Sequence, residues 1–418
     1  MKEQFKTYIL AGLVITSVLL TLNIWSIAPK YEAVDAPQFA SNIALNDPSY
    51  QRTLGNVVIP GEIIAHFGDD KHSALFPGQS GYESALGLLR QASLSDVSIT
   101  TDYGEAEWNK IVRETPSLQF NFDATLPGSV LEDANLMRLN ARLESTLQMQ
   151  SLYLFRLPGD ADLRALFYGG EDQPMYTARV VVNKDLYSKL FQDLKDEPPY
   201  NLYGQSLYRN FYLPATRQKW PSYNLSFGLD TDVQRLANSF FIDKSMTRRV
   251  IERDGSQIIT DGSRLVRLSA REHLVDYRNL DLERPQNQNF DADFGILKAL
   301  SFVNEHGGFT GQVVMHENPL LRPEQKIVRR SYQFRQTLSG LPLIGNLTSV
   351  YVNVLGYDVL TMRRSQFALV GKPYREESGS DVLSGPEVLK LVEDSAWLDR
   401  NRVTNVYLAY LMGDAQEQ

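Results

Sequence analysis

Few residues of this chain have the type and spacing that chemistry requires. Two of its five histidines, His66 and His72, flank the acidic pair Asp69-Asp70. Imidazole and carboxylate groups are common metal ligands, but the spacing here does not match HExxH or a comparable metal motif. We therefore expect His66 and His72 to be solvated loop residues and predict no metal site.

Motifs for nucleophilic or phosphate chemistry are also weak. Gly78-Gln79-Ser80-Gly81 lacks the GxSxG spacing of a serine hydrolase, and we expect Ser80 to cap a helix instead. No P-loop and no dinucleotide-binding glycine pattern occurs in the sequence. The absence of cysteine excludes disulfides, thiolate catalysis and Cys-ligated zinc. We predict no catalytic or cofactor-binding residues and a protein that is not an enzyme. The sequence leaves open whether a catalytic pair of carboxylates comes together in the folded chain.

Aromatic residues gather in the middle of the chain, and two interpretations fit them. They could line a groove for a carbohydrate or a peptide, or they could pack in the core of a sheet, which we favour. The residues concerned are Tyr200, Tyr203, Tyr208, Phe211, Tyr212, Trp220 and Tyr223.

An uncharged segment, residues 7–27, lies close to the N-terminus. At about 1.5 Å per residue a helix of this length crosses the roughly 30 Å hydrocarbon layer. Lys2 and Lys6 precede the segment and favour a cytoplasmic N-terminus. A cleaved signal peptide has a shorter apolar region, and Pro29 makes a poor cleavage junction. We predict a cell-membrane protein with a retained single-pass transmembrane helix, a cytoplasmic tail at 1–6 and an extracytoplasmic remainder.

One face of the predicted transmembrane helix carries small and polar side chains. Gly12, Thr16 and Asn23 fall within about 40° of one another around a helix. Small residues allow helices to approach closely, and amides hydrogen-bond across the interface. We predict that these three residues contact a membrane partner. The alternative is that Asn23 reaches the lipid headgroups and Gly12 is incidental.

Composition bounds the class of protein. The sequence is 43% hydrophobic and 22% charged, which is ordinary for a globular protein. A chain of 418 residues is long enough to form more than one hydrophobic core. The formal net charge of -8 argues against nucleic acid as a partner, because nucleic acid requires a basic face. Contact with membrane lipid is expected through residues 7–27.

Proline-rich and polar stretches divide the remainder of the chain. We predict a stalk at 28–55, an N-terminal extracytoplasmic domain at 56–196, a middle domain at 197–288 and a C-terminal domain at 289–418. Helical patterns occur at 80–90, 103–113, 184–194, 291–304 and 385–395, and a hairpin pattern with Asp-Gly turns occupies 247–268. Helices packed on mainly antiparallel sheets explain this order, so the predicted fold class is α+β.

Three segments of the sequence together resemble a known family. They are LNIWSIAPKYE (Leu22–Glu32), FIDKSMTRRVIERDGSQIITDGSR (Phe241–Arg264) and YQFRQTLSGLPLI (Tyr332–Ile344). The chain resembles the YycH family, accessory regulators of the WalK/WalR (YycG/YycF) two-component system in low-GC Gram-positive bacteria. The resemblance extends over the layout of the chain, with a short start, one anchor and an exported remainder.

The resemblance implies a function without an active site. It implies a three-domain ectodomain whose last domain is similar to the partner protein YycI. It also implies contacts with YycI and with the sensor histidine kinase WalK (YycG), which tune kinase output and cell-wall homeostasis. Two alternatives remain: an anchored module that binds a cell-wall glycan or peptide, and an anchored wall hydrolase, which requires a cleft with closely placed carboxylates.

Overall fold

In the computed structural model the chain forms two units, Met1–Ser41 and Asn42–Gln418. The residues that the structure describes are 4, 6, 13, 14, 16, 17, 21, 50–140, 147–171, 173–206, 209–229, 233–283, 292–317, 329–345, 347–376, 378–395 and 406–413.

In the first unit the described residues are helical. Thr21 Oγ1 donates a hydrogen bond to the Ser17 carbonyl oxygen one turn earlier, at 2.9 Å. The rest of the predicted span 7–27, and most of the predicted stalk, lie outside the described residues. Within the part of the chain that is described, no helix combines the length and the apolar character needed to cross a membrane.

Among the described residues, the first of two large sheets contains ten strands in the order β10-β9-β2-β1-β4-β6-β7-β8-β3-β5. Neighbouring strands are antiparallel, apart from β3 beside β5. The strands are β1 (Glu62–Gly68), β2 (Lys71–Leu75), β3 (Ser93–Thr100), β4 (Pro116–Pro127), β5 (Arg138–Leu139), β6 (Gln148–Phe155), β7 (Leu163–Tyr168), β8 (Met175–Val181), β9 (Tyr200–Ser206) and β10 (Arg209–Pro214). Side chains alternate between the two faces of a strand, so this sheet has two distinct surfaces.

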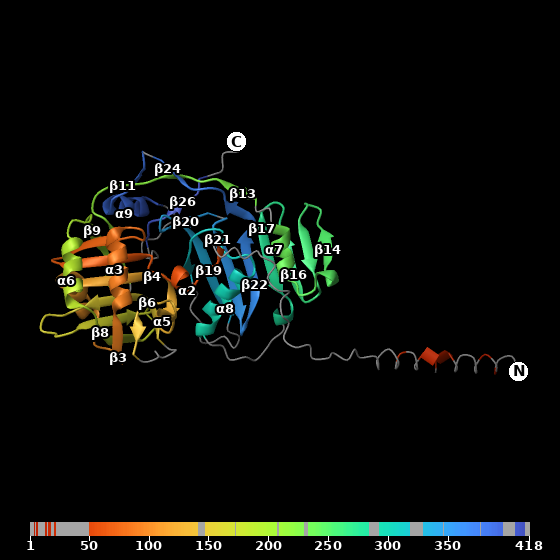
Figure 1. The fold of residues 1–418 in the computed structure, drawn as a ribbon, viewed down its shortest axis with the longest axis horizontal. Helices are drawn as coiled ribbons and strands as arrows, with labels where there is room; N and C mark the ends of the chain where they lie inside the picture. The colour runs from red at the N-terminus through yellow and green to blue at the C-terminus, as the bar shows by residue number, and fades with distance from the viewer. Residues whose placement is uncertain are drawn as a thin grey trace. The chain divides into compact units, whose positions relative to one another are not determined.

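Two helices, α3 (Ser80–Gln91) and α6 (Lys184–Asp193), cover one face of this sheet (Figure 1). Their apolar side chains pack on alternate residues of the central strands, such as Phe120 of β4 and Leu154 of β6. The prediction that Ser80 caps α3 is wrong by one residue. Gln79 has the extended backbone of the capping position, and Ser80 is already helical.

The opposite face is covered in part by a shorter helical segment. This segment is α4 (Glu105–Asn109), continued by a π-helical stretch, Lys110–Glu114. Trp108, which is fully buried, packs with Tyr153 and Phe155 of β6. The short helices α2 (Leu54–Val57) and α5 (Val130–Asp133) complete this half of the chain.

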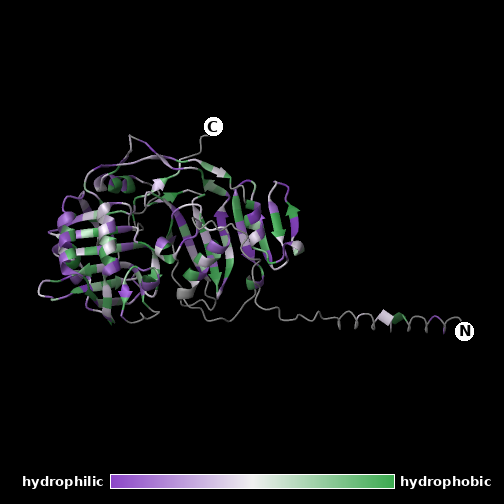
Figure 2. Ribbon diagram, in the orientation of Figure 1, coloured by the Kyte–Doolittle hydropathy of each residue, from purple (hydrophilic) through white to green (hydrophobic). Residues whose placement is uncertain are grey.

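The second sheet has the order β14-β15-β16-β17-β22-β21-β19-β20-β26, with β18 also paired to β19. Helix α8 (Ala292–Glu305) packs on it, and α7 (Val233–Ser239) precedes it in the chain. Both hydrophobic and hydrophilic residues occur along the strands of the two sheets (Figure 2). The strands are β14 (Arg248–Ile251), β15 (Gln257–Thr260), β16 (Arg264–Leu268), β17 (Leu274–Asn279), β18 (Val313–Glu317), β19 (Arg329–Leu338), β20 (Leu341–Ile344), β21 (Ser349–Leu355), β22 (Asp358–Ser365) and β26 (Tyr410–Leu411).

A two-stranded ribbon runs between the two sheets along the top of Figure 1. It consists of three short antiparallel ladders: β11 (Gln218–Trp220) with β25 (Ser380–Val382), β12 (Tyr223–Asn224) with β24 (Tyr374–Arg375), and β13 (Phe227–Leu229) with β23 (Phe367–Leu369). Helix α9 (Gly385–Asp394) follows the ribbon and begins with a capping box between Ser384 and Glu387. Two 3₁₀ turns, Lys244–Met246 and Asp281–Glu283, lie in the intervening chain.

The mixed helix and sheet architecture agrees with the predicted α+β class. Strand pairing divides the predicted middle domain, 197–288, between the two sheets. Its first strands, β9 and β10, extend the first sheet, whereas β14 to β17 join the strands of 289–418 in the second.

Candidate functional site

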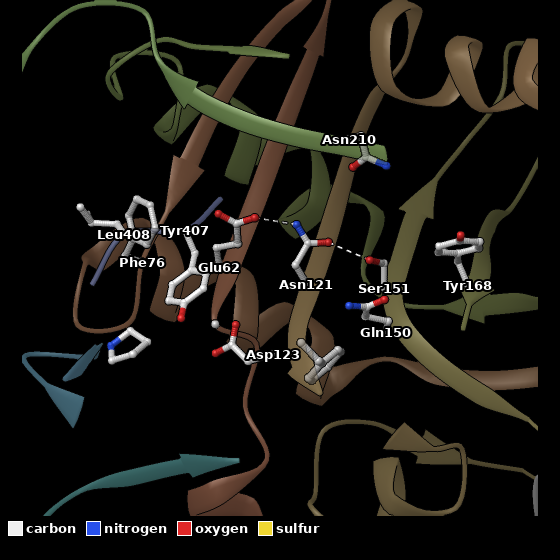
Figure 3. A pocket seen from close by; sticks show the side chains of 13 residues that line it. Glu62, Phe76, Asn121, Asp123, Gln150, Ser151, Tyr168, Asn210, Tyr407 and Leu408 are labelled. Carbon is white, nitrogen blue, oxygen red and sulfur yellow. Dashed lines mark hydrogen bonds between the residues drawn. The ribbon is translucent and has the colours of Figure 1, made fainter. Parts of the chain in front are cut away.

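Polar side chains meet in a cleft on the face of the first sheet that α3 and α6 leave uncovered. The cleft is open to solvent and lies between the strands of this sheet and residues from the C-terminal part of the chain. Figure 3 shows Glu62, Asn121 and Asp123 along the cleft, with Tyr407 opposite Glu62 and Ser151 further along.

Strand alternation places these side chains. In Gln119-Phe120-Asn121-Phe122-Asp123 of β4, both phenylalanines belong to the core cluster that includes residues of α3. The polar residues between them must then point to the other face. Glu62 of β1 lies directly opposite Asn121 of β4 in the strand register, and Ser151 of β6 pairs with Asn121 on its other side.

Glu62 is the group with the most altered acidity in the cleft. Its Oε1 accepts a hydrogen bond from Asn121 Nδ2 at 2.8 Å, and Asn121 Oδ1 accepts one from Ser151 Oγ at 2.9 Å. Burial raises the pKa of the Glu62 carboxyl to about 7, although the hydrogen bond from Asn121 opposes the rise and the nearby Asp123 adds to it. Glu62 can therefore gain or lose a proton near neutral pH.

The far wall of the cleft comes from residues more than 200 positions later in the chain, among them Pro342 and Tyr407. The Tyr407 hydroxyl lies 3.3 Å from His316 Nε2, and His316 Nδ1 lies 4.0 Å from Asp123 Oδ2. The turn at Gly340 touches the first sheet's half of the chain, because a Cβ on Gly340 would come within 2.2 Å of the Pro77 carbonyl oxygen.

The arrangement can do one of two things chemically. A carboxyl of raised pKa beside a second acidic group is what acid–base hydrolysis uses, and the same pair can bind a cation. Among the described residues no group of three or more His, Asp and Glu side chains is placed to hold a metal ion.

The histidine pair is not solvated, which corrects the sequence-based prediction. His66 of β1 and His72 of β2 are 0% and 2% exposed, and their Nδ1 atoms lie 2.9 Å apart. Asp69 and Asp70 do form a turn, but it joins two paired strands, so the histidines face each other across the hairpin. Burial holds the pKa of His66 well below its usual range and also lowers that of His72. Two neutral rings make this contact when the Nδ1–H of one ring donates to the Nδ1 of the other.

The aromatic residues of the middle region pack mostly into the fold. Tyr200 and Tyr212 are buried in a cluster with Phe76 and Leu341. Tyr203 and Phe211 stack on each other across β9 and β10, at 6.3 Å between ring centroids. The side chain of Tyr208 lies outside the described residues. The favoured interpretation, core packing rather than a groove, is confirmed for Tyr200 and Tyr212.

The predicted partner-contact face is described at one position. Thr16 is helical and exposed within its unit. Gly12 and Asn23 lie outside the described residues, so the contact face stays a prediction.

The cleft itself was missed by the sequence analysis. A usable signal exists, because Gln119, Asn121 and Asp123 alternate with the large apolar residues Leu118, Phe120 and Phe122. The neighbouring walls gave no such signal, since Glu62 and Tyr407 are single residues far away in the sequence.

Comparison with known proteins gives consistent matches along the chain. The family description "YycH protein, N-terminal domain" matches residues 3–199, and "YycH protein, C-terminal domain" matches residues 208–418. A relative from Bacillus subtilis (strain 168), the "Two-component system WalR/WalK regulatory protein YycH", is 21% identical over 432 residues, which cover 98% of this chain and 90% of the relative. The crystal structure of YycH from Bacillus subtilis has the same fold, with a TM-score of 0.70 and 15% identity over 87% of this chain and 94% of that one. On these matches, the chain belongs to the YycH family.

Proposed function

We propose that this chain is a membrane-anchored regulator of the sensor histidine kinase of a WalR/WalK two-component system. The observation that carries the proposal is a likeness over 98% of the chain to a protein named for that regulatory role. YycI is proposed as a second partner, and cell-wall homeostasis as the process that is tuned.

Such a regulator works by differential binding. A protein shifts the balance between two signalling states of a kinase only if it binds one state more tightly than the other. A difference of about 1–3 kcal/mol changes the balance several-fold to a hundred-fold. Confinement of both proteins to one membrane raises their effective concentration, so weak contacts between helices suffice. We assign the principal contact to residues 7–27, through Gly12, Thr16 and Asn23.

Replacement of the anchor tests this assignment. Exchanging residues 7–27 for an unrelated transmembrane helix should abolish co-purification with the kinase and the regulation of its output. The double variant Thr16→Leu with Asn23→Leu should weaken both. Val14→Leu with Thr21→Leu is the matched control, because these positions lie on the opposite side of a helix that turns about 100° per residue, and it should behave as wild type. Full regulation by a chain with a foreign anchor would assign the contact to the remainder of the chain.

Hydrolysis is the second candidate, and one observation favours it: Glu62 and Asp123 share the cleft. Turnover of purified cell wall by the full chain, compared with its Glu62→Gln variant, separates the two functions. A regulator releases no wall fragments in either case, whereas a hydrolase loses its activity when the proton-donating carboxyl is removed.

A further inference from the structure

The charges around the cleft are unbalanced. Glu62 and Asp123 enter it, and no Lys, Arg or His is among its described lining residues. The hydrogen-bond donor to Glu62 Oε1 is a neutral amide, that of Asn121. A buried carboxylate without a positive partner is unfavourable. The cleft therefore repels anions and gains from a cation.

The remaining lining groups suit a cation attached to a polar molecule. Gln150 and Ser151 offer an amide and a hydroxyl at one end of the cleft, and the rings of Phe76 and Tyr407 lie near Glu62 (Figure 3). Aromatic ring faces attract ammonium groups, and amides hydrogen-bond to hydroxyl or peptide groups beside them.

A buried polar atom at the edge of the cleft supports a ligand there. The side chain of His316 is 8% exposed, and its Nδ1 has no hydrogen-bond partner among the residues that the structure describes. This atom lies 4.0 Å from Asp123 Oδ2, too far for a direct hydrogen bond. A hydroxyl or amide group can bridge such a gap.

We propose that the cleft between Glu62, Asp123 and Tyr407 binds a ligand that carries a primary ammonium group beside hydroxyl or amide groups. The ammonium pairs with the two carboxyl groups, and the polar groups contact the amide and hydroxyl side chains. A peptide amine and an amino sugar share this chemistry. The site is separate from residues 7–27, so it holds whether or not those residues contact a kinase.

Binding of a cation here depends on pH. Only the ionised form of Glu62 attracts the ammonium, and burial raises its pKa to about 7. The titratable groups that face Glu62 are Asp123, Tyr407, Tyr200 of β9 and Tyr212 of β10, and burial raises the pKa of Tyr200 and Tyr212. Their phenols stay neutral in the working range, so affinity falls as pH drops through the pKa of Glu62.

The test uses the full chain in nanodiscs and isothermal titration calorimetry. N-acetyl-lysine methylamide probes a peptide amine and glucosamine probes an amino sugar. N-acetyl-norleucine methylamide and N-acetylglucosamine are their uncharged matches. We expect one ammonium probe to bind at about pH 7.5, its uncharged match not to bind, and binding to weaken more than tenfold at about pH 5.5. The probe that binds identifies the source of the amine.

Variants assign the binding to the cleft. Glu62→Gln should weaken binding at least tenfold and remove most of its pH dependence, and Asp123→Asn should also weaken it. Glu171→Gln removes an exposed carboxylate from a turn elsewhere and should bind as wild type. The proposal is overturned if neither ammonium probe binds, if the uncharged matches bind equally, or if Glu62→Gln binds normally. Should Glu62→Gln fail to fold, Asp123→Asn and the comparison of probes on the wild-type chain still decide.

Discussion

At the scale of single residues, buried titratable groups on the first sheet respond to pH in opposite directions. The raised pKa of Glu62 means that the folded chain holds a proton there which the unfolded chain has released. Its contribution to stability is present below about pH 4.5 and is lost as pH rises to about 7. His66 and His72 are neutral when folded, so they lower stability as pH falls below about 6.5, where the unfolded rings take up protons.

Glu62→Gln isolates the first of these effects. Because glutamine cannot ionise, the variant should be more stable than wild type above pH 7, by at most about 3 kcal/mol, since part of the side chain faces the open cleft. The two proteins should have equal stability near pH 4. Urea unfolding at several pH values measures the difference, in which the histidine contributions cancel. If the difference in free energy of unfolding between the two proteins were the same at every pH, Glu62 would have the same pKa in the folded and unfolded states.

At the same scale, local sequence predicted the turn at Asp69-Asp70 but not the burial of the histidines beside it. Both aspartates have a positive φ, at 50° and 55°, as acidic turn residues often do. His66 and His72 are covered by Tyr212, which comes from a strand about 140 positions later. A contact between residues so far apart in the sequence is not predictable from the seven residues 66–72 alone.

At the scale of elements, one glycine allows the hairpin of β19 and β20 to lie close to Pro77. Gly340 has a φ of 86°, and a Cβ there would lie 2.2 Å from the Pro77 carbonyl oxygen. Gly340→Ala should therefore strain the backbone and also displace the hairpin. Gly262 has a similar φ of 96°, but a Cβ there would meet no atom within 4 Å, so Gly262→Ala should only strain the backbone. Strain alone costs about 1–2 kcal/mol, so Gly340→Ala should lose clearly more stability in urea unfolding. Equal losses would mean that the hairpin does not press on Pro77.

Elements with strong local patterns were predicted well, and those set by packing were not. The hairpin pattern predicted at 247–268 is confirmed, since this segment contains the paired strands Gln257–Thr260 and Arg264–Leu268, and the Asp-Gly turn between them sets the register. The helix predicted at 103–113 instead changes to a π-helical stretch at Lys110. In the ribbon, β11 pairs with β25, which lies about 160 residues later in the chain. Local sequence patterns do not predict a pairing between segments so far apart.

At the scale of the whole molecule, residues Asn42–Gln418 form one compact unit. A single cluster of buried apolar residues extends from Leu54 to Met362 and includes both sheets. The chain just before the first sheet is hydrogen-bonded to α8 through the side chain of Asn304. Asn304 Oδ1 accepts a hydrogen bond from the Arg52 backbone N–H at 3.0 Å, and Asn304 Nδ2 donates one to the Arg52 carbonyl oxygen at 2.8 Å. Beside it, the Phe309 N–H donates to the Tyr50 carbonyl oxygen at 2.7 Å.

Asn304→Ala tests whether this fastening couples the two sheets. The variant leaves the Arg52 backbone N–H and carbonyl without their partner, which should cost about 1–3 kcal/mol. In calorimetry of the full chain we expect one transition for residues 42–418 of the wild type, and a lower or divided transition for Asn304→Ala. Ser301→Ala, on the same helix and exposed, is the matched control and should retain the wild-type profile. Three separate transitions in the wild type would instead support independent domains at 56–196, 197–288 and 289–418, because independent cores unfold without regard to one another.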